Sequence, residues 1–445
     1  MSYIAEIPYI GWVIPFIVVL GVVVFVHEYG HYIVGRWVGI RADVFSIGFG
    51  PELFAWRDKR GMRWRVGALP LGGYVKFAGD MNAASAGADA AALARMSADE
   101  RKGAFHTAAV WRRALTVLAG PMANFLLSIL VFAFIAMLAG REVNEPVIGS
   151  VRADANADLG LMAGDRVLAV GGDQVASFTD LLVALSQVEG EPTTARILRD
   201  GREATVEIRY RRPARVDEVI PGGAAADAGL KPGDVITAVN GAPTPNFEAL
   251  RARIADSGGA MLSLDVQRGD EALILSMTPQ MVETPGPDGA PVKRPMIGVR
   301  NASFGGIAPM FETANPIDAL DYGAARTWAI IAGTFDYLGE MISGEADSSQ
   351  LGGPVQIAKI SGQAAEQGFE SLALMIALIS TSIGLINLFP IPVLDGGHLL
   401  FHLLEAVRGK PLRPRWQEIG NGVGFGMIML LMVFATYNDL TNLLR

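Results

Sequence analysis

The sequence contains no cysteine, and this absence limits the kinds of site that the protein can build. Disulfides and thiolate metal ligands are both excluded, so any transition-metal site must use histidine and carboxylate. Histidine is itself scarce, with five residues in 445. Lys and Arg number 37 against 45 Asp and Glu, and the net charge of -8 argues against a general nucleic-acid binder.

Charged residues are also scarce, at 18% of the chain, whereas 51% of residues are hydrophobic. This composition is typical of a few membrane spans combined with soluble domains. Four apolar runs approach the roughly 20 residues that cross a bilayer as a helix. They are Ile10 to Ile33, Ala114 to Ala139, Leu372 to Phe389 and a shorter run from Val423 to Tyr437. The first run lacks a basic flank and a cleavage site, so we expect a retained span and not a signal peptide.

Basic residues cluster between the first and second runs and again between the third and fourth. The residues before Tyr9 include no Lys or Arg. By the positive-inside rule both basic loops face the cytoplasm. The two termini and the large insert, residues 141–371, are therefore predicted on the outer side.

The first run ends in His27-Glu28-x-x-His31. Positions i and i+4 share one face of a helix, so the two imidazoles converge as a pair of zinc ligands with Glu28 beside them as a general base. The alternative is two helical histidines at a membrane boundary, with Glu28 as a solvated cap. Ionisable groups at this depth are costly and usually functional, which favours the metal.

A catalytic zinc needs a third protein ligand, and the sequence offers Asp395. Pro390 and Pro392 break the third run where it leaves the bilayer, and Asp395 follows at a glycine-flanked turn. Asp395 could instead cap the helix that follows. His398 is a rival ligand, although it and His402 could equally be surface residues of that helix.

The segments between the spans have their own patterns. Val44–Ile47, Met62–Ala68 and Tyr74–Phe77 are predicted as strands of a small sheet beside the metal helix. Residues 81–101 are Ala-rich and polar and are predicted as a linker or loose surface helix, with no assigned role. Asn315–Ser343 is predicted as an amphipathic helix near the outer membrane boundary.

The insert also contains an internal repeat. Residues 157–167 align with 226–236, and at the same offset Gly172 matches Gly241 and Phe178 matches Phe247. Each copy reads as a glycine loop, a strand, a turn, a helix and further strands. The repeat resembles the PDZ domain, which binds extended peptides by strand addition. The alternative is a pair of small β modules that act as spacers.

Taken together, the motifs resemble those of the site-2 protease family of intramembrane zinc metalloproteases. They are His27-Glu28-Tyr29-Gly30-His31, Phe45-Ser46-Ile47-Gly48-Phe49-Gly50, Pro70-Leu71-Gly72-Gly73-Tyr74-Val75-Lys76, Gly120-Pro121-x-x-Asn124-Phe125 and Asn387-x-x-Pro390-x-x-x-Leu394-Asp395-Gly396. The resemblance implies a polytopic α-helical membrane protein with four spans, a membrane-associated β sheet and two tandem PDZ domains of α+β type. It also implies zinc near the cytoplasmic side.

The same resemblance implies a role for each site residue. His27, His31 and Asp395 would be the zinc ligands, Glu28 the catalytic base, and Asn387 and Asn124 residues near the substrate. Zinc makes water more acidic, Glu28 takes its proton, and a peptide bond of an unwound substrate helix is hydrolysed. The edge of the sheet at Met62–Phe77 could hold the unwound segment as an added strand.

We therefore expect five parts. Residues 1–142 form the first half of the membrane core, 143–212 and 213–282 the two PDZ domains, 283–371 a periplasmic linker with the amphipathic helix, and 372–445 the second half of the core. From the resemblance we expect a bacterial inner-membrane location, with the PDZ domains and both termini in the periplasm.

The expected substrates, also from the resemblance, are single-span membrane proteins already trimmed outside the membrane, such as an anti-sigma factor or remnant signal peptides. We expect no nucleic-acid partner. One alternative is a PDZ scaffold with structural zinc that cuts nothing, but a structural site needs no base such as Glu28. Another is a transporter, which the lack of repeated spans and the peripheral metal disfavour.

Overall fold

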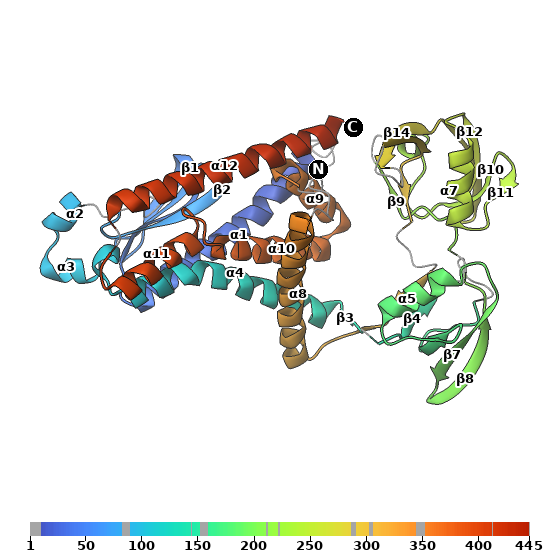
Figure 1. Ribbon diagram of the computed structural model, residues 1–445, viewed down its shortest axis with the longest axis horizontal. Coiled ribbons are helices and arrows are strands. Elements are labelled where there is room, and N and C mark those ends of the chain that lie inside the picture. Colours follow the sequence, from blue (N-terminus) through green and yellow to red (C-terminus); the bar gives the residue numbers. More distant parts are fainter. Residues whose placement is uncertain are drawn as a thin grey trace. The chain divides into compact units, whose positions relative to one another are not determined.

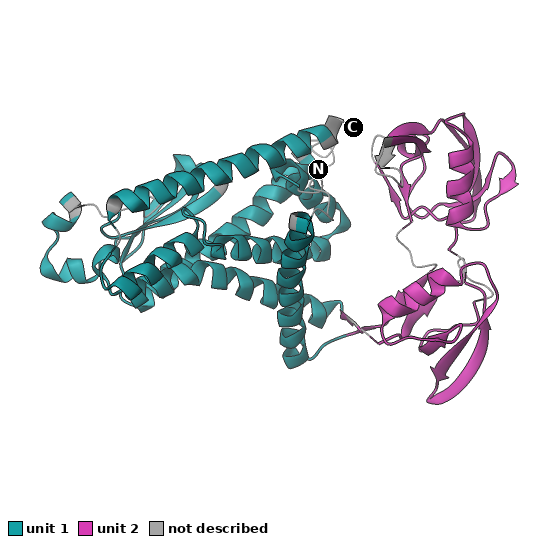
Figure 2. Ribbon diagram, in the orientation of Figure 1, with its two compact units in different colours: residues 1–140, 313–445 teal, residues 141–312 magenta. Residues whose placement is uncertain are grey.

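A computed structural model describes most of the chain as two compact units, shown in Figure 2. The described residues are 10–81, 90–143, 145–151, 159–210, 212–220, 223–285, 291–301, 306–343, 352–411 and 413–444. Unit 1 consists of residues 1–140 and 313–445, and unit 2 is the insert between them, residues 141–312. Tyr9, residues 82–89 of the predicted linker and the first two positions of the first repeat copy lie outside the described residues.

Unit 1 is mainly helical (Figure 1). Its elements are α1 (Ile10–Trp37), β1 (Ala42–Arg57), β2 (Arg63–Phe77), α2 (Ala90–Arg95), α3 (Ala98–Lys102), a 3-10 turn (Phe105–Thr107), α4 (Val110–Leu138), α8 (Pro316–Ser343), α9 (Pro354–Gln367), α10 (Phe369–Leu388), α11 (Asp395–Arg408) and α12 (Pro414–Leu444). Among them α1, α4, α10 and α12 are long and apolar enough to cross a membrane, which confirms the four predicted runs.

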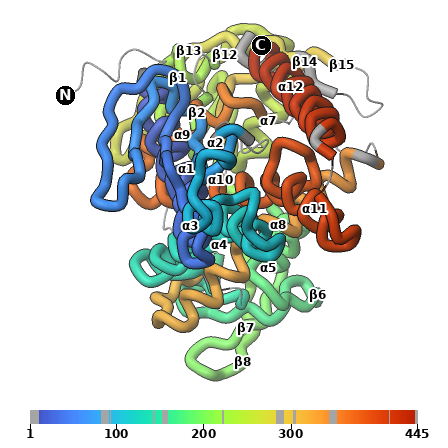
Figure 3. Tube along the Cα trace, turned by 90° about the vertical axis from the view of Figure 1, so that its left-hand side faces the viewer, coloured from blue at the N-terminus to red at the C-terminus, as the bar shows by residue number. Residues whose placement is uncertain are grey.

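The predicted small sheet is built from β1 and β2, which are antiparallel and pack against α1 (Figures 1 and 3). The start of β1, Val44–Ile47, pairs on one edge with the start of β2 and on the other edge with its end. The three predicted strand segments lie in this sheet, apart from Met62, since β2 begins at Arg63. The base of the sheet is buried, and the rings of Phe45 and Trp64 pack there in a tilted arrangement, with 4.6 Å between their centroids. Its far end exposes apolar side chains such as Leu53 and Phe54. That exposure is consistent with a hairpin that meets lipid.

Helix α4 is the centre of unit 1 and contacts α1, α8, α10 and α11. Small and hydroxyl side chains let these helices approach closely, as is common inside membranes. The Ser128 hydroxyl on α4 lies 2.6 Å from Thr381 Oγ1 on α10 and accepts a hydrogen bond of 3.2 Å from Thr327 on α8.

The helix predicted over Asn315–Ser343 is present as α8. By contrast, α9 was not predicted from the sequence.

Unit 2 contains short strands and helices. They are β3 (Arg141–Glu142), β4 (Ile148–Val151), β5 (Arg166–Val170), β6 (Asp173–Gln174), α5 (Phe178–Gln187), β7 (Thr193–Arg199), β8 (Arg202–Ile208), β9 (Glu218–Val219), α6 (Ala224–Asp227), β10 (Val235–Val239), β11 (Ala242–Pro243), α7 (Phe247–Asp256), β12 (Leu262–Arg268), β13 (Glu271–Met277), β14 (Gln280–Pro285), β15 (Pro291–Met296), β16 (Val299–Arg300), β17 (Ile307–Pro309) and β18 (Phe311–Glu312).

The internal repeat appears as two modules with the same strand order. One sheet runs β6-β5-β7-β8 and the other β11-β10-β12-β13. In each, a buried aspartate after the glycine loop pairs with an arginine on the third strand. Asp165 binds Arg199 and Asp234 binds Arg268, each with two contacts of 2.7 Å. Because identical contacts recur at one offset, both copies of the repeat fold alike.

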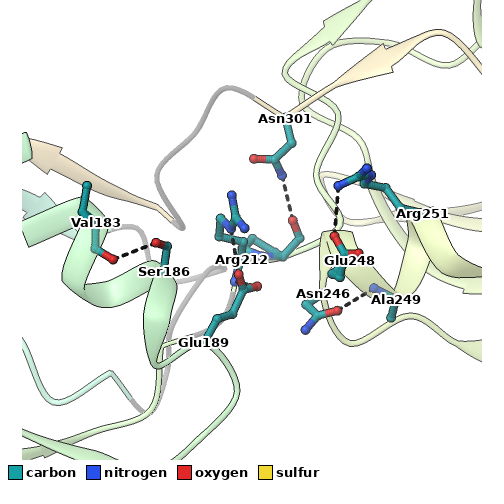
Figure 4. A network of polar contacts seen from close by, with 10 residues as sticks. Val183, Ser186, Glu189, Arg212, Asn246, Glu248, Ala249, Arg251 and Asn301 are labelled. Carbon is teal, nitrogen blue, oxygen red and sulfur yellow. Dashed lines mark hydrogen bonds and ion pairs between the residues drawn. The ribbon is translucent and has the colours of Figure 1, made fainter. Parts of the chain in front are cut away.

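The two modules are interleaved along the chain. Ile307 of β17, which follows the second module, lies in the core of the first, where β17 pairs with β4. At the joint between the modules, Arg212 contacts Glu189 at 2.9 Å and the Asn301 side chain donates to the Pro213 carbonyl at 2.9 Å (Figure 4). The chain leaves the first module, builds the second, and returns to complete the first.

Candidate metal centre

Helix α1 presents His27 and His31 on one face, one turn apart, as the spacing predicted. Both side chains are buried, and their Nε2 atoms lie 3.2 Å apart. The His31 Nδ1–H donates to the Thr116 carbonyl of α4 at 2.9 Å. Since a carbonyl only accepts, Nδ1 must carry the proton, and the lone pair of His31 Nε2 is free for a ligand.

Asp395 is brought to the histidines by a distorted loop between α10 and α11. Helix α10 ends at Leu388, and two prolines prevent it from continuing. Val393 then adopts a φ of 89°, a left-handed conformation that is unusual for a β-branched residue. Gly396 has no room for a Cβ, because the Leu388 carbonyl lies against it. The loop is thus folded tightly back on the start of α11.

The three candidate ligand atoms form a small triangle. Asp395 Oδ2 lies 3.1 Å from His27 Nε2 and 3.4 Å from His31 Nε2, and the two nitrogens are 3.2 Å apart. A tetrahedral zinc with bonds of about 2.0–2.1 Å requires ligand atoms about 3.3–3.4 Å apart. Asp395 Oδ2 is also buried without a hydrogen bond among the described residues. The residues present therefore fit a zinc ion.

Asn124, on α4, lies behind His27. It is fully buried, and its Nδ2 is 3.2 Å from His27 Nδ1, while its Oδ1 has no hydrogen bond among the described residues. A 180° rotation of the amide places Oδ1 against Nδ1, so that Nδ1–H donates to it and Nε2 is left for the metal. Asn124 does not line the cavity at the metal site, where the resemblance had suggested a contact with substrate.

Gly120 lies on the same helix, one turn before Asn124. A Cβ at this position would overlap the imidazole of His31, with Nε2 as its nearest atom. The Gly120-Pro121-x-x-Asn124 motif thus provides space for the imidazole of His31 and a hydrogen-bond partner for His27. From the sequence alone the motif only supported the resemblance, since nothing local shows which histidine it faces.

A cavity of about 220 Å³ opens beside the triangle and is lined by Glu28 and Asn387. The Glu28 side chain packs against Gly73 of β2 and faces the backbone N–H of Val75. Asn387 donates one amide hydrogen to the Ile383 carbonyl at 3.0 Å, which fixes its side chain at the end of α10. A carboxylate and an amide thus border the space next to the metal ligands.

Comparison with known proteins agrees with this geometry. A model described as "Peptidase family M50" matches residues 15–431. The chain belongs to peptidase family M50. It is 39% identical over 434 residues to "Putative zinc metalloprotease Atu1380" of Agrobacterium fabrum, covering 98% of this chain and 97% of that protein. It is 31% identical over 465 residues to "Regulator of sigma E protease" of Salmonella typhi, covering 96% and 98% of the two chains.

Membership of family M50 establishes the coarse biochemistry. The chain is a zinc metalloprotease of the site-2 type and an integral membrane protein with four apolar helices. The cofactor is zinc, and among the described residues His27, His31 and Asp395 form a group that could hold it.

The two histidines of α11 in this M50 chain, His398 and His402, lie outside the triangle. His398 lines the cavity, and burial lowers its pKa. His402 lies one turn further along α11, and burial lowers its pKa to about 4. His402 is therefore neutral near pH 7. Asp395 is the first residue of α11, and no side-chain cap is found there, so the capping role considered for it is not observed.

A buried ion pair fixes α11 to the M50 core. Arg113 of α4 forms a two-pronged contact with Glu405 of α11, with nitrogen–oxygen distances of 3.1 and 2.7 Å. The two parallel hydrogen bonds of such a bidentate pair restrict how the two side chains lie relative to each other. Because Asp395 starts α11, this pair helps to fix the third candidate ligand relative to α4, which packs against the helix of the two histidines. The sequence contained no signal for it, since the partners are separated by 292 positions.

Proposed function

We propose that this chain cleaves peptide bonds within the membrane-spanning segments of single-span proteins. The observation that supports it most directly is the place of the metal site. Its two histidines and Glu28 lie in α1, one of the four helices able to cross a membrane. The site is thus built at the depth where a substrate span would lie.

Each site residue has a proposed role. His27, His31 and Asp395 hold zinc, which supplies Lewis-acid polarisation of a peptide carbonyl and makes water more acidic. Glu28 takes the proton from the attacking water and returns it to the leaving amine. Asn387 hydrogen-bonds the substrate backbone beside the scissile bond. Asn124 orients His27.

A substrate helix hides its carbonyls in its own hydrogen bonds and must unwind before cleavage. Strand β2 supports a place for the unwound segment, because Gly73, Tyr74 and Val75 line the cavity beside Glu28. These three residues pair with β1 along one edge, through Ile47, Ser46 and Phe45, and no strand pairs with their other edge among the described elements. We infer that the substrate adds as a strand along that edge.

The two modules of unit 2 are proposed to be PDZ domains, the first completed by β17. We place them and both termini in the periplasm of a bacterial inner-membrane protein. The proposed substrates are trimmed single-span proteins, such as an anti-sigma factor or remnant signal peptides. The name of the Salmonella relative supports the first of these. The scaffold alternative, a zinc-containing PDZ protein that cuts nothing, conflicts with membership of a peptidase family and with the position of Glu28 in the cavity.

The modules are proposed to exclude substrates with large outer domains. The other role considered, capture of a new C-terminus on the glycine loops, would need free backbone donors. In the structure the Met162 N–H already donates to Asp165 at 2.8 Å and the Lys231 N–H to Asp234 at 2.9 Å. These loops therefore bind their own carboxylates, which supports exclusion by size.

A deletion separates the two roles. Val143 N–H donates to the Met310 carbonyl at 2.9 Å, so replacing residues 144–309 by Asn-Gly should close a tight hairpin and leave unit 1 intact. Under exclusion, the deleted protein cuts untrimmed substrates that the full chain leaves alone. Under terminus capture, it gains no substrates and cuts trimmed ones more slowly.

The proteolytic function is tested with purified full-length protein in liposomes and a trimmed single-span reporter. Mass spectrometry should locate the cut inside the apolar span, and a zinc chelator should stop it. A reporter that stays intact, or a cut only outside the span, would refute intramembrane cleavage. As a matched control, His398→Ala should retain zinc whereas Asp395→Ala loses it.

A further inference from the structure

A second cavity lies in unit 1, away from the metal site. It has a volume of about 390 Å³, within the range of about 300–1,000 Å³ that is typical of small-molecule sites. Helices α4, α8, α9 and α10 all contribute to its wall. On α10 the lining residues run from Ser371 to Leu378, the first half of this candidate span. The metal ligand Asp395 lies beyond the opposite end of α10.

The wall of this cavity has a polar part and an apolar part. Arg326, Gln363, Gln367 and Ser371 supply polar groups, the last three around the corner where α9 meets α10. Phe132, Ile330, Ile360, Leu374, Met375 and Leu378 supply the apolar surface. The wall is therefore amphipathic, with its polar side next to the start of a span. No acidic residue lines the cavity among those that the structure describes.

Arg326 is the charged group of this wall. It lies on α8, and its guanidinium makes no hydrogen bond or ion pair with any other described residue. Arg326 is exposed, and α8 is not among the four helices that could cross a membrane, so the guanidinium is accessible to a lipid headgroup at the edge of the apolar region. Its planar donors suit a phosphate, which they bind through two hydrogen bonds at once.

We propose that the cavity binds a phospholipid, with the phosphodiester at Arg326 and one acyl chain along the apolar wall. The rise along α10 from Ser371 to Leu378 is about 10 Å, enough for several methylenes of the chain. Each buried methylene contributes about 0.8 kcal/mol, so the apolar wall supplies affinity, while Arg326 selects the phosphate. The two glutamines supply further hydrogen bonds to the headgroup.

The test compares two probes with identical acyl chains, phosphatidylglycerol and diacylglycerol, on the full-length protein in detergent by native mass spectrometry. The wild type should bind phosphatidylglycerol at least about tenfold more tightly than diacylglycerol, as expected for a hydrogen bond to a charged group. Arg326→Gln should remove this preference, and Arg326→Lys should retain part of it. Lys359→Gln is the matched control, because Lys359 neighbours Ile360 on α9 but does not line the cavity.

A second variant tests the apolar wall. Leu374→Trp should fill the cavity and weaken the binding of both probes, and a thermal unfolding transition should confirm that the variant is folded. Equal binding of phosphatidylglycerol by wild type and Arg326→Gln would overturn the phosphate contact, and unchanged binding by Leu374→Trp would overturn the site. Binding of inorganic phosphate or of a peptide carboxylate by a protein that does not bind phosphatidylglycerol would assign the cavity to another ligand and refute the proposal.

Discussion

Asn124 provides a sharp test of how the metal site is held together. We expect Asn124→Leu, a change of similar volume, to weaken zinc binding without unfolding the protein. The residue is fully buried, so water cannot replace the lost acceptor for His27 Nδ1–H. Loss of such a partner typically lowers metal affinity about 10–100-fold, or about 1.4–2.7 kcal/mol.

The measurement is zinc affinity by competition with a chelator of known affinity, on purified full-length protein. Asn124→Asp retains an oxygen acceptor and should keep affinity within about threefold of wild type, well short of the 10–100-fold loss expected without an acceptor. Ser128→Ala is the matched control, since Ser128 lies one turn further along α4 and is equally buried but contacts Thr381 and Thr327 instead. Unchanged zinc affinity in Asn124→Leu, or an equal loss in Ser128→Ala, would refute the orienting role.

Three further predictions concern the site and unit 2. Gly120→Ala should abolish zinc binding measured by metal analysis, because its Cβ would overlap the His31 ring; retained zinc would show that the ring can move. Val393→Gly should relieve about 1–3 kcal/mol of backbone strain, raising thermal stability while weakening zinc binding through a looser loop. In the second module, burial tends to raise the pKa of Asp234, but hydrogen bonds from Arg268 and a backbone N–H outweigh it and lower the pKa. This stabilisation is present above the unfolded pKa of about 3.9 and is lost as pH falls through the lower folded value. The free energy of unfolding of this module, measured by hydrogen exchange, should therefore decrease less on acidification in Asp234→Asn than in the wild type.

Local sequence signals predicted much of unit 1. Long apolar runs place the four spans, and the i, i+4 spacing brings His27 and His31 together, because both depend on helix geometry alone. The broken third run also pointed to Asp395 correctly as a neighbour of the two histidines. The left-handed backbone conformation of Val393, which helps to place Asp395, was not predictable. The surrounding loop imposes that conformation, and the residue type does not favour it.

Contacts between distant parts of the chain were beyond the sequence analysis. Arg113 pairs with Glu405, and β17 returns to the first module, through tertiary packing. Such long-range contacts leave no periodic pattern or fixed residue spacing in a single sequence, so they could not be predicted. Helix α9 was missed for a different reason. Its mixed apolar and polar residues between Gly353 and Gly368 show neither a long apolar run nor a strong end signal, apart from Pro354 at its start.

The central claim is that Glu28 serves as the base beside a zinc held by His27, His31 and Asp395. The most direct test measures zinc content and reporter cleavage on the same preparation of Glu28→Gln. Because Glu28 lines the cavity but is not part of the metal-binding triangle, the variant should hold zinc at the wild-type stoichiometry and cut no reporter. Cleavage at the wild-type rate by the zinc-loaded variant would contradict the account.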